Sequence, residues 1–127
     1  MRRNHILLVE SDPFLASLYA RALREAGHRV SLTSRDGARY FLKSDRPNLV
    51  LCDIHPGGRA DFAILASLTA MPETAEVPIV CLAQSPQKEH VAKALSYGAR
   101  SFVVKGHHTA TEVASYASLA LKSNGYV

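Results

Sequence analysis

The sequence of 127 residues contains no tryptophan, only two cysteines and no long run of apolar residues. Two cysteines cannot form the disulfide framework that stabilises small secreted domains. No apolar stretch approaches the roughly 20 residues that cross a membrane. The stretch that follows Arg2 and Arg3 ends at Glu10, which is too short for the core of a signal peptide. We therefore expect a soluble cytoplasmic protein with reduced cysteines and no membrane partner.

A concentrated basic surface is also lacking. Lysine and arginine number 15 against 11 aspartate and glutamate residues, which gives a net charge of +4. A basic balance of this kind can indicate nucleic-acid binding. Here the basic residues are spread along the chain, and no basic run interleaves with aromatic residues, so we expect solvated surface charge and no nucleic-acid partner. The length and the hydrophobic fraction of 47% fit one compact domain over residues 1–127.

Short apolar runs alternate with longer amphipathic segments. Continuous apolar runs predict strands that are buried on both faces of a sheet, and they cover residues 5–10, 28–33, 48–53, 77–82 and 100–104. The alternation predicts a single-domain α/β fold with a doubly wound, five-stranded parallel sheet and five helices. The flavodoxin-like strand order 2-1-3-4-5 is one of the two common arrangements for such a sheet.

Helical spacing of apolar residues fills the gaps between these runs. It predicts helices over 13–26, 36–44, 59–70, from Ser85-Pro86 to Gly98, and from 110 to about 123. Asp12 followed by Pro13 predicts an N-cap and the first position of the first helix. Thr109 and Glu112 have the spacing of a capping box, which predicts the start of the last helix.

Two acids and a lysine stand at strand ends. Glu10 ends the first apolar run, Asp53 ends the third and Lys105 follows the fifth. In a doubly wound sheet these carboxyl ends line one crevice. Carboxylates suit Mg²⁺, a carboxylate beside it can attack a phosphoryl donor, and a lysine can balance the charge of the transferred group. Each residue alone is typical of a solvated strand end, but their joint placement predicts a phosphoryl-transfer site.

Four motifs resemble the receiver domain of bacterial two-component response regulators, and the resemblance covers almost the whole chain. The motifs are residues 6–13 (ILLVESDP), 47–53 (PNLVLCD), 77–80 (VPIV) and 97–105 (YGARSFVVK). The resemblance implies that Asp53 is the phosphoacceptor and that Glu10 is the first of the acids that hold Mg²⁺. It implies that Lys105 contacts the phosphoryl group and that Phe102 is the aromatic switch residue. His55 stands where the family offers a backbone carbonyl to the metal.

The sequence departs from the family at four positions. Ser11 occupies the second acidic position, and Ala83 replaces the Ser or Thr that hydrogen-bonds the phosphoryl oxygen. Pro56 comes one residue early, and Gly106 replaces the Pro that usually follows Lys105, which predicts a trans peptide there. All four lie at the carboxyl edge of the predicted sheet, so the site could be weakened while the core stays intact.

Two functional interpretations therefore remain open. In the first, the chain is a signalling module and not an enzyme: Asp53 accepts a phosphoryl group from a histidine kinase or phosphotransfer protein, with Mg²⁺ bound weakly or not at all. The output is a protein contact through the face of helix 4, strand 5 and helix 5, which carries Lys93, Tyr97, Arg100 and Tyr116. In the second, the chain is a pseudo-receiver that binds a partner without phosphorylation.

The remaining histidines and cysteines have simpler interpretations. His55, His107 and His108 fall near the predicted site and could bind Zn²⁺. Their spacing matches no standard zinc motif, so we expect solvated loop histidines. Cys52 and Cys81 lie inside predicted strands, which favours a role as small core residues.

Overall fold

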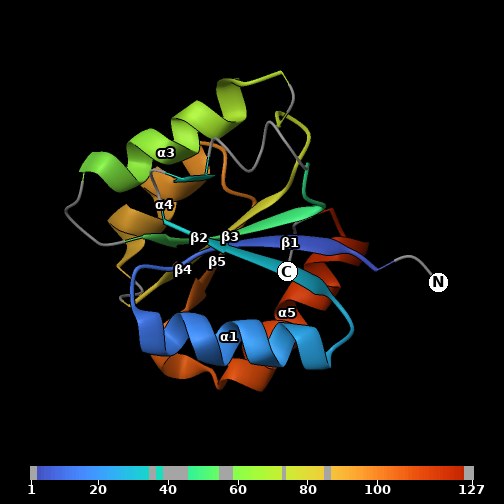
Figure 1. The fold of residues 1–127 in the computed structure, drawn as a ribbon. Coiled ribbons are helices and arrows are strands. Elements are labelled where there is room, and N and C mark those ends of the chain that lie inside the picture. Colours follow the sequence, from blue (N-terminus) through green and yellow to red (C-terminus); the bar gives the residue numbers. More distant parts are fainter. Residues whose placement is uncertain are drawn as a thin grey trace.

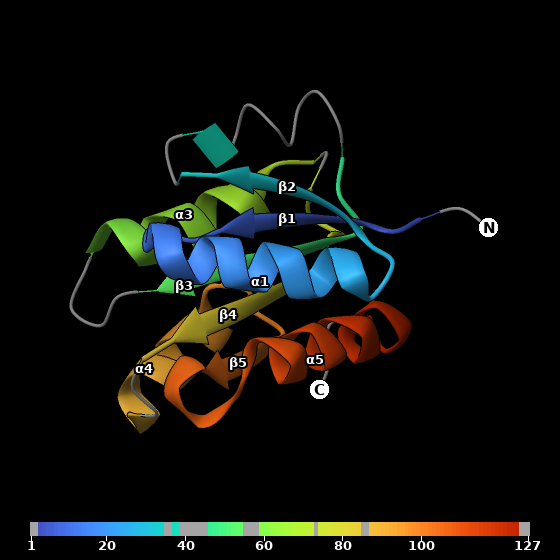
Figure 2. The same cartoon turned by 60° about the horizontal axis from the view of Figure 1, so that its bottom comes forward.

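A computed structural model describes residues 3–34, 37–38, 46–54, 59–72, 74–84 and 87–124, with only the backbone described for 59–64. Five parallel strands form one sheet in the order β2-β1-β3-β4-β5, which confirms the predicted flavodoxin-like order. The strands are β1 (His5–Val9), β2 (Arg29–Thr33), β3 (Leu49–Ile54), β4 (Ile79–Ala83) and β5 (Ser101–Val104). Figure 2 shows β1 to β4 pointing the same way, so their carboxyl ends share one edge.

Helices cover both faces of the sheet. They are α1 (Pro13–Glu25), α3 (Arg59–Ala70), α4 (Lys88–Ser96) and α5 (Ala110–Lys122). Helices α1 and α5 lie on one face and α3 and α4 on the other (Figure 1). The described residues thus contain four α-helices where five were predicted. The expected helix over 36–44 falls outside them except for Gly37 and Ala38, which are helical. Within the described residues, no helix is long and apolar enough to span a membrane.

Helix α1 begins where the sequence predicts. The Asp12 carboxylate accepts hydrogen bonds from the backbone N–H groups of Phe14 (2.9 Å) and Leu15 (3.2 Å). Gly27 follows the helix with φ 96°, a conformation that glycine adopts without a steric penalty. The Asp12 side chain is therefore the predicted N-cap of α1.

Helix α5 is also confirmed, but α4 begins later than expected. Thr109 and Glu112 form the predicted capping box, with both reciprocal hydrogen bonds present. The sequence pattern predicts the start of α4 at Ser85-Pro86, two residues that lie outside those the structure describes. In the structure Gln87 is the N-cap with extended backbone angles (φ −59°, ψ 127°), so the helix starts at Lys88. An extended residue at 87 interrupts helical hydrogen bonding, which explains the shorter helix.

The core consists of two apolar layers, one on each face of the sheet. Alternate strand residues point to opposite faces because the side-chain period of a strand is two. The layer under α1 and α5 contains Ile6, Leu8, Leu51, Leu82 and Val103 with Tyr19, Leu23, Val113 and Ala117. The layer under α3 and α4 contains Leu7, Val9, Cys52, Ile54, Cys81, Leu68 and Ala94. This two-sided burial holds the strand ends rigidly at the carboxyl edge.

Candidate functional site

Three charged residues are buried together at the carboxyl edge of the sheet. Glu10 follows β1, Asp53 lies near the end of β3, and Lys105 opens a short 3₁₀ helix directly after β5. They are 7%, 3% and 7% exposed, respectively. Charged side chains are seldom buried to this extent unless they are paired. The edge between β1 and β3 is also where the strand order reverses, the usual place for a ligand in such a sheet.

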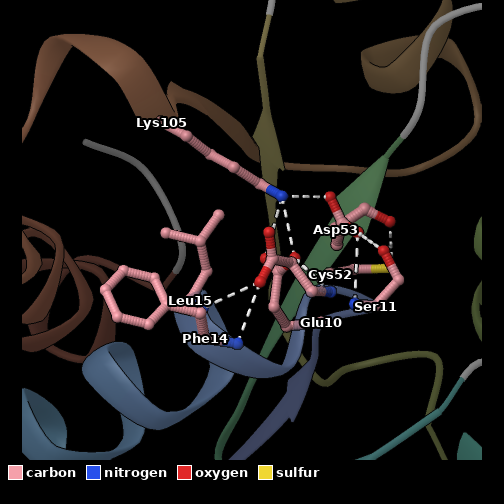
Figure 3. A network of polar contacts seen from close by, with 8 residues as sticks. Glu10, Ser11, Phe14, Leu15, Cys52, Asp53 and Lys105 are labelled. Atoms are coloured by element: carbon pink, nitrogen blue, oxygen red, sulfur yellow. Dashed lines mark hydrogen bonds and ion pairs between the residues drawn. The ribbon is translucent and has the colours of Figure 1, made fainter.

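Lys105 joins the two carboxylates. Its Nζ donates a hydrogen bond to Glu10 Oε1 at 3.0 Å and forms a close ion pair with Asp53 Oδ1. Glu10 Oε2 lies 2.9 Å from the same nitrogen but receives no hydrogen bond of good geometry. Figure 3 shows the ammonium group between the two acids. Glu10, Asp53 and Lys105 were predicted to meet at one edge, and the structure brings them into direct contact.

Burial and pairing act in opposite directions on these groups. Burial raises the pKa of Glu10, and the hydrogen bond from Lys105 offsets part of this effect. Burial disfavours the charge of Lys105, but the hydrogen bonds to Asp53 and Glu10 outweigh it and raise the pKa of Lys105 above its ordinary value. The lysine is therefore an ammonium group at neutral pH, ready to balance negative charge beside Asp53.

Ser11 contacts the other oxygen of Asp53. Its Oγ–H donates to Asp53 Oδ2 at 2.6 Å, and its backbone N–H lies 3.3 Å from the same oxygen. In Figure 3 Ser11 and Lys105 approach the carboxylate from different sides. The sequence pattern treated Ser11 only as the loss of an acid. Its role as a donor to the predicted phosphoacceptor was missed, although a hydroxyl directly after Glu10 was a visible signal for a donor at this edge.

The predicted switch positions lie on the α3 and α4 side of the sheet. Ala83 is the last residue of β4 and is buried, opposite Ile54 of β3 and Val104 of β5. Phe102 is half-buried and packs against the core layer of that face. No peptide bond among the described residues is cis, so the Lys105–Gly106 peptide is trans, as predicted.

The structure describes two of the three histidines that were considered as zinc ligands, His107 and His108. His55 and Pro56 lie outside the described residues. His107 is exposed, whereas His108 packs edge-on against Tyr116, with ring centres 4.8 Å apart. Over the described ranges, no three His, Cys, Asp or Glu side chains are grouped to hold a metal ion.

Both cysteines are buried and carry free thiols, in line with the predicted core role. The register places Cys52 directly opposite Cys81 on neighbouring strands. Burial raises the pKa of the Cys81 thiol, which disfavours the reactive thiolate.

The donor set at this edge does not fit Mg²⁺ as it stands. Asp53 Oδ1 faces the Lys105 ammonium group, and Oδ2 accepts the Ser11 hydroxyl. Glu10 Oε1 accepts from Lys105 and from the Asp12 backbone N–H at 3.2 Å, and Oε2 faces Lys105. Among the described residues, each carboxylate oxygen of the pair already lies against the Lys105 ammonium group or the Ser11 hydroxyl, so a cation bound there would have to share or displace these partners.

The response regulator receiver domain model matches residues 6–115. The chain is 25% identical over 107 residues to the gliding motility regulatory protein of Myxococcus xanthus, covering 83% of this chain and 14% of that protein. It is 31% identical over 102 residues to the nitrogen assimilation regulatory protein NtrX of Azorhizobium caulinodans, covering 79% of this chain and 22% of that protein. Thus it spans less than a quarter of either relative.

A solved structure of the Mn²⁺-bound response regulator Rcp1 has the same fold, with a TM-score of 0.80 and 22% identity over 94% of this chain and 96% of that one. Receiver domains are generally signalling modules of two-component systems and not enzymes. They interact with histidine kinases or phosphotransfer proteins and typically bind Mg²⁺ at the phosphorylation site. The fold, the edge site and the matched residues agree: this chain belongs to the response regulator receiver domain family.

Proposed function

We propose that this receiver domain accepts a phosphoryl group on Asp53 from a cytoplasmic histidine kinase or phosphotransfer protein. The observation that carries the proposal is the Lys105 ammonium group, which is buried and in direct contact with Asp53 Oδ1. A fixed positive charge beside a carboxylate stabilises the negative charge that accumulates when a phosphoryl group is transferred to it.

The transfer uses the carboxylate as nucleophile. One oxygen of Asp53 attacks the phosphorus atom of the phosphohistidine donor, the P–N bond breaks, and the leaving imidazole recovers a proton from solvent. Lys105 balances the charge on the phosphoryl oxygens, while Ser11 holds the carboxylate from its other side. The product is an acyl phosphate on Asp53.

The proposed output surface is the face of α4, β5 and α5. Lys93 and Tyr97 are exposed on and just after α4, and Arg100 before β5 and Tyr116 on α5 are half-buried. Arg100 donates to the Asn124 carbonyl at 2.6 Å, which ties the start of β5 to the end of α5. A downstream protein that binds here would contact both helices and the strand between them.

Intact mass spectrometry tests the proposal. The whole chain is incubated with phosphoramidate in the presence of Mg²⁺, alongside Asp53→Asn and the matched control Asp12→Asn, which keeps a good helix cap. We expect the native chain and Asp12→Asn to gain the mass of one phosphoryl group and Asp53→Asn to gain none. An unmodified native chain, or equal modification of Asp53→Asn, would contradict the proposal.

A second candidate is a pseudo-receiver that binds its partner without phosphorylation. It is favoured by Ala83, a buried residue that has no hydroxyl to offer a phosphoryl oxygen. Phe102 already packs against the core layer without any phosphoryl group. If the native chain gains no phosphoryl mass, this candidate takes the place of the first.

A further inference from the structure

We infer that Ser11 takes the place of a divalent cation at Asp53, so that the chain's own donors hold the phosphoacceptor and Mg²⁺ is not part of the site. The inference deepens the proposed function because it concerns the same carboxylate. It rests on the contacts around that carboxylate and not on the absence of a bound ion.

The first argument is geometric. The Ser11 hydroxyl donates to Asp53 Oδ2 at 2.6 Å, and the Ser11 backbone N–H lies 3.3 Å from the same oxygen. Lys105 covers Oδ1. A hydrogen bond to an ionised carboxylate is short and about twice as strong as one between neutral groups. Each oxygen of Asp53 therefore has a donor from the chain itself.

The second argument concerns charge. Glu10 and Asp53 carry two negative charges, and Lys105 neutralises one of them. Ser11 adds a neutral hydroxyl at the position where the family has an acid, so the pocket keeps a single net negative charge. Mg²⁺ demands near-octahedral oxygen ligands and releases its water reluctantly. To bind, it would have to displace both the Lys105 ion pairs and the Ser11 hydrogen bond.

The third argument concerns access. Asp53 is 3% exposed, and the side chain of Lys105 is 5% exposed. Oδ1 of Asp12, the next acid along the chain, is already engaged by the backbone N–H groups at the start of α1. Ser11 and Lys105 together can then orient Asp53 for attack without a metal ion.

The experiment measures metal binding directly. Mn²⁺ broadens amide signals near its binding site, so it is titrated into the whole ¹⁵N-labelled chain, followed by competition with Mg²⁺. We expect no saturable, Mg²⁺-reversible broadening at the amides of Glu10, Ser11 and Asp53 in the native chain. Ser11→Asp should acquire saturable, Mg²⁺-reversible broadening, because it adds an oxygen ligand and a negative charge beside Glu10 and Asp53. Ser17→Asp, which adds the same charge on the exposed side of α1, should behave as the native chain.

Saturable broadening at these amides in the native chain would overturn the inference. So would a Ser11→Asp variant that gains no affinity, because Ser11 would then not be the residue that sets metal binding. The readout needs no phosphorylation. A native chain that takes no phosphoryl group but shows the expected titrations would reject the proposed function and leave this inference standing.

Discussion

The two oxygens of the Asp53 carboxylate face different kinds of partner. Oδ1 faces a buried ammonium group that also pairs with Glu10. Oδ2 faces the hydroxyl of Ser11. A buried charge network is costly to disturb, whereas a neutral hydroxyl can be exchanged for another small group. Electrostatics therefore constrains the Oδ1 side of this site, and the Oδ2 side tolerates small changes better.

Removing the charge on the Oδ1 side should have the largest effect on stability. Lys105→Met leaves the carboxylates of Glu10 and Asp53 buried without a counter-charge. We expect the free energy of unfolding to fall by roughly 3–5 kcal/mol, as when one partner of a buried ion pair is removed. Urea unfolding measures it, with Lys93→Met as the control on the exposed side of α4. A loss no larger than that of the control would show that the lysine is not a buried partner.

Substitution on the Oδ2 side should lower the free energy of unfolding by less. Ser11→Ala removes one hydrogen bond to a charged acceptor, while the backbone N–H of residue 11 still faces the same oxygen. We expect a loss of about 1.5–3 kcal/mol in the free energy of unfolding, below that of Lys105→Met. The matched control is Ser17→Ala, at an exposed position of α1. The comparison between the two sides breaks down if Ser11→Ala costs as much as Lys105→Met.

A substitution at Ala83 should make the conformation of the proposed output surface depend more strongly on phosphorylation of Asp53. Ala83→Thr adds a hydroxyl near the site at a cost of about 1–3 kcal/mol, because the position is fully packed. We expect beryllofluoride to shift the amide signals of α4, β5 and α5 only slightly in the native chain and more in Ala83→Thr. A ligand shifts a conformational equilibrium only through contacts that differ between the two states. Large shifts in the native chain would mean that the signal runs through another route.

The smallest expected effect concerns pH. Burial raises the pKa of Glu10 above 4.5, so its proton is held more tightly in the folded chain than in the unfolded one. This tighter binding of the Glu10 proton adds to the free energy of unfolding. The contribution is fully present below pH 4.5 and is lost as the pH rises through the folded-state pKa of Glu10. Glu10→Gln has no such proton, so its unfolding free energy relative to the native chain should rise with pH in that window.

Urea unfolding over this pH range tests whether the stability of Glu10→Gln relative to the native chain rises with pH. Glu25→Gln, at an exposed side chain on α1, corrects for the removal of one negative charge. A relative stability of Glu10→Gln that falls with pH would show that pairing with Lys105 outweighs burial at Glu10.

Much of this architecture follows from local patterns. The apolar runs that end in Glu10 and Asp53 predict β1 and β3, because only a sheet covered on both faces accommodates continuous apolar strands. Asp12 and Pro13 predict the start of α1 because the cap is a local hydrogen bond. Once the strands are parallel, their carboxyl ends share one edge, which places Glu10, Asp53 and Lys105 at the same edge of the sheet.

Other features depend on contacts that no local pattern specifies. From the sequence, Ser11 is interpreted only as the loss of an acidic residue. Its hydrogen bond to Asp53 is seen only once the segment after β1 is placed next to β3. Ser85-Pro86 carries a helix-start signal, yet the extended backbone of Gln87 delays α4 to Lys88. The Ser11 contact is decided by tertiary geometry and not by the residue type, whereas nothing in the residue pattern marks the backbone conformation of Gln87.

The most direct test of the central claim is the rate of Asp53 phosphorylation with and without a divalent cation. The native chain and Ser11→Asp are each incubated with phosphoramidate in excess Mg²⁺ or in excess chelator, and the phosphoryl mass is followed over time. If Ser11 and Lys105 hold Asp53 in place of a cation, the native rate is the same in both solutions and only Ser11→Asp depends on Mg²⁺. A native chain that is phosphorylated in Mg²⁺ and not in chelator would contradict the account.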